Sequence, residues 1–170
     1  MIAILGNSPS SGSTLLADLL DSSQYTACGV ELNLFSNKQF YDFDKFKKRY
    51  QLSGYSPSIH RIRNRLNIYR LHSYGMNEEE FAQLLSQSKD IWDFTDHFSK
   101  RFLALRGKPL DGIVFEKTPE NINCIGEFLH TFPESYFVHI VRNPLFVYYS
   151  LRNREFPHFI ATLSWLVDIA

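Results

Sequence analysis

A loop rich in glycine and serine, residues 6–14, carries the residue types that best indicate chemistry in this chain. It follows a short apolar run at 2–5 that is typical of a buried strand, and leucines at helical spacing come after it. In such a strand–loop–helix unit, backbone N–H groups converge on an anion, and the helix N-terminus adds about half a positive charge. An ATP-hydrolysing phosphate loop needs a lysine just before its Ser or Thr, whereas Gly12 is followed here by Ser13. The loop therefore predicts a site for a phosphate-like group other than the γ-phosphate of ATP.

Three charged residues stand at the ends of further predicted strands, namely Glu31, Lys117 and Arg142. Ser150 lies beyond them, on the helix that follows Arg142. In an open parallel sheet, the carboxyl ends of the strands form one crevice. We therefore expect a carboxylate, an ammonium and a guanidinium group to share one site with the anion-binding loop.

Alternating strand and helix patterns must position these residues. That alternation predicts an α/β fold, a parallel sheet covered by helices, in a single domain over residues 1–170. A mostly helical insert at 36–106 separates the second strand from the third. Strands are expected at 2–5, 25–28, 112–115 and 136–141, and helices at 14–21, 78–106, 122–132, 145–153 and from 157 onward.

The insert carries no motif that identifies a substrate, so we predict only that it forms the acceptor region. Its segment 45–73 has eight Lys or Arg residues and no acid. Such a segment is either a solvated face or a surface for an anionic acceptor. Trp92 and the phenylalanines between 81 and 102 are expected in the core rather than in an acceptor pocket.

Four motifs resemble those of sulfotransferases that use 3′-phosphoadenosine 5′-phosphosulfate (PAPS). The run PSSGSTLLADLL resembles the 5′-phosphosulfate loop. The run YFVHIVRNPLFVYYSLRNR resembles the 3′-phosphate motif, in which a Ser follows the Arg by eight residues. FEKTPENI resembles the family's Lys-Thr-Pro element, and CGVELNLF resembles the segment with a catalytic Glu in the bacterial and tyrosylprotein branches. The resemblance implies a P-loop-NTPase-like three-layer fold. Family members usually carry more sequence after the last helix, so a C-terminally truncated fold is one interpretation of this chain.

The resemblance also implies a role for each site residue. Arg142 and Ser150 would bind the 3′-phosphate, and Lys117 would stabilise the sulfuryl group during an in-line displacement that leaves PAP. Glu31 would take the proton from an acceptor hydroxyl or amine, and no metal is required. The loop residues expected to bind the 5′-phosphosulfate are Ser10, Ser11, Gly12, Ser13 and Thr14, with Ser10 standing where the family usually has Arg or Lys.

Composition narrows the class of partner. The formal net charge is zero, which argues against a nucleic-acid binder, and no apolar stretch is long enough for a transmembrane helix. Two isolated cysteines and the lack of a signal peptide favour a reducing, cytoplasmic location. We therefore expect a small-molecule, glycan or peptide acceptor, with no membrane partner and an undetermined oligomeric state.

Two alternatives stay open at this point. The chain could be a non-catalytic or incomplete protein that binds PAPS or PAP, because Ser10 replaces a cation. A small-molecule kinase with a degenerate loop is the other alternative, and the missing lysine before Ser13 argues against it.

Overall fold

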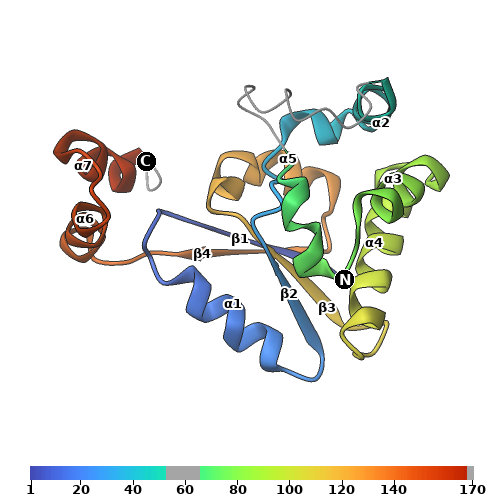
Figure 1. Ribbon diagram of the computed structural model, residues 1–170, viewed down its shortest axis with the longest axis horizontal. Coiled ribbons are helices and arrows are strands. Elements are labelled where there is room, and N and C mark those ends of the chain that lie inside the picture. The colour runs from blue at the N-terminus through green and yellow to red at the C-terminus, as the bar shows by residue number, and fades with distance from the viewer. Residues whose placement is uncertain (53–65, 168–170) are drawn as a thin grey trace.

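A four-stranded parallel sheet organises the computed structural model, which describes residues 1–52 and 66–167. The strand order is β2-β3-β1-β4, and the prediction of an α/β fold with a parallel sheet flanked by helices is confirmed. Figure 1 shows the four strands crossing the centre of the molecule. The strands are β1 (Ile2–Asn7), β2 (Thr26–Val30), β3 (Ile113–Lys117) and β4 (Tyr136–Ile140).

Helices fill the connections between the strands. One helix joins β1 to β2, and the described part of the longer segment between β2 and β3 contains several helices separated by turns. The α-helices are α1 (Ser13–Ser22), α2 (Phe43–Leu52), α3 (Glu78–Gln87), α4 (Ile91–Leu105), α5 (Ile125–Thr131), α6 (Pro144–Asn153) and α7 (His158–Val167). The 3-10 helices are η1 (Lys38–Tyr41), η3 (Ile68–Tyr74) and η4 (Pro119–Cys124).

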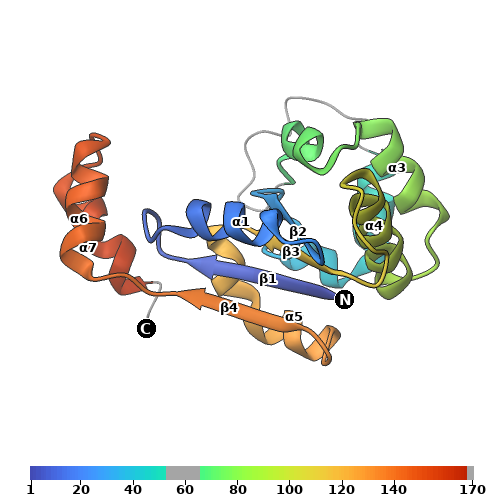
Figure 2. The ribbon, with the colours of Figure 1, turned by 90° about the horizontal axis from the view of Figure 1, so that it is seen from below.

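Each face of the sheet has its own apolar core because side chains alternate along a strand. On one face, Ile4 and Val114 pack in a cluster rich in buried phenylalanines from η1, α2, α3, α4 and α5. On the other face, Leu5 and Phe115 pack against α1, around the buried Ala17. Figure 2 shows the sheet from the side, with α1 and α5 on opposite sides of β1 and β4. The three layers hold the carboxyl ends of the strands at one edge.

The single helix predicted from Glu78 to Arg106 is wrong, because the chain breaks between α3 and α4. Ser88 has an extended backbone, and the Asp90 side chain accepts a hydrogen bond from the Asp93 N–H at 2.8 Å, which caps the start of α4. A new N-cap ends one helix and starts another even where apolar spacing continues.

The prediction that Trp92 lies in the core is also wrong. Its side chain is exposed, and its indole N–H donates to the Thr131 carbonyl at 2.8 Å. The neighbouring Phe94, Phe98 and Phe102 are fully buried, as expected. The start of α4 presents Trp92 away from the face that those phenylalanines bury.

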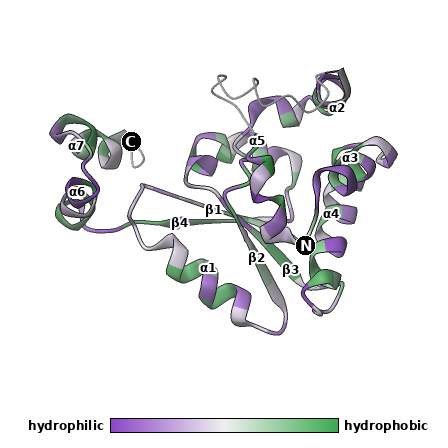
Figure 3. Ribbon diagram, viewed as in Figure 1, coloured by the Kyte–Doolittle hydropathy of each residue, from purple (hydrophilic) through white to green (hydrophobic). Residues whose placement is uncertain are grey.

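A hairpin of α6 and α7 lies beyond the carboxyl end of β4, away from α3 and α4 (Figure 1). Val147, Leu151 and Ala161 form a small core between the two helices. Figure 3 shows further hydrophobic residues on both helices, and several of them, including Phe146 and Phe159, are exposed.

Candidate functional site

The predicted anion-binding loop connects β1 to α1. Gly12 precedes the first residue of α1 and has a left-handed backbone with φ of 96°. A Cβ at Gly12 would meet no atom within 4 Å, so the backbone here faces open space. Ser10 also has a left-handed backbone, with φ of 66°. The two left-handed residues turn the chain sharply from the strand into the helix.

The start of α1 is suited to an anion. Among the residues that the structure describes, no side chain caps its N-terminus, and its first turn has no acidic residue. The side chains of Ser11 and Ser13 are buried, whereas Gly12 and Thr14 are exposed. The Ser11 hydroxyl has no hydrogen-bond partner within the described parts of the chain. Uncapped N–H groups and a buried, unpaired hydroxyl are donors that an anion can satisfy.

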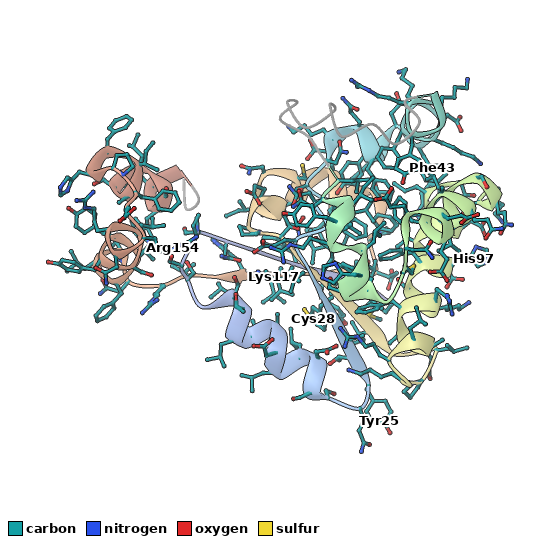
Figure 4. The ribbon with its side chains drawn as sticks, viewed as in Figure 1. Tyr25, Cys28, Phe43, His97, Lys117 and Arg154 are labelled. Atoms are coloured by element: carbon teal, nitrogen blue, oxygen red, sulfur yellow. The ribbon has the colours of Figure 1, made fainter. Side chains whose placement is uncertain are left out.

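Two arginines that follow β4 in the chain contact this loop. Arg142 donates from Nη1 to the Ser10 carbonyl at 2.9 Å, and Arg154 donates from Nη1 to Ser10 Oγ at 3.3 Å. Figure 4 shows Arg154 between α6 and the loop that precedes α1. The pairing of β4 with β1 brings Arg142 here, as the topology argument predicts. Arg154 ends the run that resembles the 3′-phosphate motif, but no role was predicted for it, because its contact with Ser10 spans 144 residues.

Two further contacts fix the turn after β4, which contains Arg142. The Trp165 indole N–H donates to the Arg142 carbonyl at 2.8 Å, which joins α7 to the turn after β4. The Asn143 side chain accepts from the Leu145 N–H at 2.9 Å and caps α6. The sequence Arg-Asn-Pro therefore forms both a strand end and a helix start.

Glu31 and Lys117 form an ion pair at the ends of β2 and β3. The Lys117 Nζ lies 2.8 Å from Glu31 Oε1, and the lysine side chain is only 4% exposed, against 36% for the glutamate. The backbone joins them as well, because the Glu31 N–H donates to the Lys117 carbonyl at 2.6 Å. Lys117 lies within β3 rather than after it, since the ladder continues through its pairing with Leu5 and Val30. Two of the predicted catalytic residues are thus in direct contact.

A second cation faces the same carboxylate. The Arg70 guanidinium lies 3.6 Å from Glu31 Oε2, and Asn67 donates from Nδ2 to the Glu31 carbonyl at 2.7 Å. Both residues come from the start of η3, within the insert. Arg70 was counted only as part of the basic segment 45–73, because the sequence has no signal that pairs it with Glu31.

Three other described basic residues of this segment have partners elsewhere. Lys45 pairs with Asp42 at 2.5 Å, Lys47 donates to the Ser88 carbonyl, and Arg49 donates to Gln39. Arg61, Arg63 and Arg65 lie outside the described residues.

Ser150 lies on α6 and is partly buried. Among residues 1–52 and 66–167, no hydrogen bond connects its side chain with Arg142 or with the loop. Its assignment to the 3′-phosphate stays a prediction.

The described residues contain no group of three or more His, Cys, Asp or Glu side chains arranged to hold a metal ion. Nor does any of their helices combine the length and apolar character needed to cross a bilayer.

Comparison with known proteins identifies one family. The model of the family described as Sulfotransferase family matches residues 2–164. Curated protein sequences give no match to the chain. The matched range includes the loop, the Glu31–Lys117 pair and both arginines that contact Ser10.

Proposed function

Because the chain belongs to the sulfotransferase family, we propose that it transfers a sulfuryl group from PAPS to an acceptor hydroxyl or amine. The observation that carries this proposal is the placement of an anion-binding loop, an ammonium–carboxylate pair and two guanidinium groups at one edge of the sheet. The whole of residues 1–170 is proposed as one domain, with the insert 36–106 forming the acceptor region.

The donors available at the loop fit the charge of PAPS. The uncapped start of α1 and the unpaired Ser11 hydroxyl would hold the 5′-phosphosulfate, together with Ser13 and Thr14. The Arg142 guanidinium, now on the Ser10 carbonyl, would bind the 3′-phosphate, because a planar fork suits phosphate oxygens. Arg154 contacts the Ser10 hydroxyl and would supply positive charge beside a loop residue that has none.

Glu31 and Lys117 would act on the transferred group. When bound, PAPS supplies the sulfuryl group, whose bond to the phosphate oxygen breaks as a bond to the acceptor oxygen or nitrogen forms. Glu31 would accept the acceptor's proton, a role worth roughly 10²–10⁴ in rate. Lys117 would stabilise negative charge on the bridging oxygen, which leaves with its electron pair in PAP.

The ion pair sets a condition on this mechanism. Lys117 Nζ lies 2.8 Å from Glu31 Oε1, so the ammonium competes with the acceptor's proton for that oxygen while the contact persists. With the donor bound, Lys117 would turn from Glu31 toward the donor's negative charge and leave Oε1 free. Arg70 would stay beside Oε2 and keep the carboxylate oriented.

The insert lies next to the proposed base, which supports its assignment to the acceptor. Asn67 and Arg70 both contact Glu31 from η3. An acceptor whose proton reaches Glu31 would therefore approach along this segment.

Transfer of radiolabelled sulfate from PAPS to a panel of phenols, amines, glycans and tyrosine peptides tests the activity. We expect labelled product, and a loss of roughly 10²–10⁴ in kcat for Glu31→Gln. Glu134→Gln, which changes an exposed carboxylate in the turn before β4, is the matched control and should keep wild-type kcat. Absence of a thermal shift with saturating PAP would refute the donor assignment, and tighter binding of ATP–Mg²⁺ than of PAP would favour a kinase.

A nucleotide-binding protein without catalysis is the second candidate. One observation favours it: both oxygens of Glu31 already face cations, Lys117 at 2.8 Å and Arg70 at 3.6 Å. PAP binding without turnover over the whole acceptor panel would support this function.

A further inference from the structure

We propose that Glu116 is the positioning residue of the candidate site, a buried carboxylate that holds the ends of β1, β2 and β3 in register. This role rests on the proposed function for its catalytic readout. Glu116 precedes Lys117 on β3 and has no exposed surface. Because side chains alternate along a strand, Glu116 points to the opposite face of the sheet from Lys117. It therefore acts through other residues and not on a ligand.

One carboxylate oxygen of Glu116 holds the turn that follows β2. Oε1 accepts from the Leu32 N–H at 3.0 Å and from the Thr118 hydroxyl at 2.6 Å. Thr118 Oγ1 in turn accepts from the Asn33 N–H at 3.2 Å. The carboxylate thus reaches two successive N–H groups directly after Glu31.

That turn has an uncommon backbone that needs such support. Glu31 and Asn33 both have left-handed conformations, with φ of 48° and 58°. Left-handed backbone is disfavoured for residues other than glycine and persists where surrounding contacts fix it. The hydrogen bonds to Leu32 and Asn33 fix it here, and so aim the Glu31 side chain at Lys117.

The other oxygen of Glu116 ties β3 to β1. Oε2 accepts from Asn121 Nδ2 at 2.8 Å, and the same amide nitrogen lies 3.0 Å from the Leu5 carbonyl. Leu5 is two residues from the end of β1, where the anion-binding loop begins. A single carboxylate is therefore linked to the loop, to the turn of Glu31 and to the strand of Lys117.

Each neighbour presents a donor to Glu116, which matches an ionised carboxylate. The contacts are a backbone N–H, a hydroxyl and an amide N–H. Burial raises the pKa of Glu116, and the hydrogen bonds from Thr118 and Asn121 oppose that effect. Glutamine has the same shape, but its amide group would set a donor against at least one of these donors.

The test compares Glu116→Gln with Thr95→Val in the full chain, measuring stability, PAP affinity and kcat. Thr95 is a matched control because it is buried and donates to the Ile91 carbonyl at 2.7 Å within α4, outside the site. Glu116→Gln should lower kcat roughly 10- to 100-fold, since a misplacement of about 1 Å can cost 10²-fold, while PAP affinity stays within about threefold. Thr95→Val should lower stability but leave kcat within about twofold.

A second variant tests the positioning role of Glu116 if Glu116→Gln does not fold. Thr118→Val keeps the carboxylate but removes the hydroxyl that donates to it and that links it to the Asn33 N–H, and it should lower kcat roughly 5- to 20-fold. An active wild type whose Glu116 and Thr118 variants keep wild-type kcat refutes the positioning role alone. A wild type that binds PAP but transfers nothing refutes the proposed function and, with it, the catalytic role of Glu116.

Discussion

The Glu31–Lys117 contact offers the sharpest test of the site, because it can be structural, catalytic or both. The perturbation is a double-mutant cycle of Glu31→Gln, Lys117→Met and the double variant. Both changes keep the approximate side-chain length and remove one charge. The cycle separates the energy of the pair from the effect of each residue on turnover.

The structure sets the size of the stability term. Two unit charges 2.8 Å apart attract by about 6 kcal/mol at an effective dielectric constant of about 20, and by about 1.5 kcal/mol in water. Glu31 is 36% exposed, so solvent screens its side of the pair, whereas Lys117 is 4% exposed and has lost hydration. We therefore expect a net coupling of about 1–2 kcal/mol in the free energy of unfolding.

The catalytic term is expected to be larger. Loss of a general base lowers kcat by roughly 10²–10⁴, which corresponds to about 2.7–5.5 kcal/mol. Urea unfolding gives the coupling energy, and transfer of labelled sulfate gives kcat. A kcat for Glu31→Gln within threefold of wild type, together with a coupling of the expected size, would refute the base role and leave the pair structural.

Three further predictions follow from other parts of the molecule. Arg142→Gln should weaken PAP binding, measured by calorimetry, roughly 10- to 100-fold, because a charge-assisted hydrogen bond is lost. The surface control Arg101→Gln should bind PAP as the wild type does, and a wild-type affinity of Arg142→Gln would show that Arg142 is not part of the site. Gly29→Ala should lower the free energy of unfolding by about 1–3 kcal/mol, because the new Cβ would lie 2.0 Å from the Tyr74 ring. Adding Tyr74→Leu to this variant should recover part of the loss, and an unchanged free energy of unfolding for Gly29→Ala would contradict the packing. Burial raises the pKa of Cys28 to about 12, so iodoacetamide at pH 8 should alkylate this thiol roughly 10²–10³-fold more slowly in the folded chain than in urea. Mass spectrometry measures the rate, and fast labelling of Cys28 in the folded chain would contradict its burial.

Local pattern was sufficient for most of the elements. The apolar run before the loop, the glycine at its end and the leucines after it specify β1, the turn and α1 within a few residues. The start of α3 likewise depends on local sequence, because the capping box of Asn77 with Glu80 uses only neighbouring residues. Patterns of this kind depend on short-range geometry, so they can be read without the rest of the chain.

The break between α3 and α4 could not be separated from a continuous helix in the same way. Apolar residues recur at helical spacing on both sides of it, since both helices bury one face in the same core. Only the cap formed by Asp90 marks the break, and a single Asp is also common within exposed helix surfaces.

By itself, the sequence determined that a loop rich in glycine and serine, a carboxylate, an ammonium and a guanidinium stand at strand ends, because each strand and its following turn are local. The tertiary structure alone decided which of them meet. Pairing of β2 with β3 puts Glu31 on Lys117, and pairing of β4 with β1 puts Arg142 on the loop. Strand order depends on packing and hydrogen bonds between segments about a hundred residues apart, so no local pattern contains it. The contacts of Arg70, Arg154 and Glu116 depend on the same long-range order.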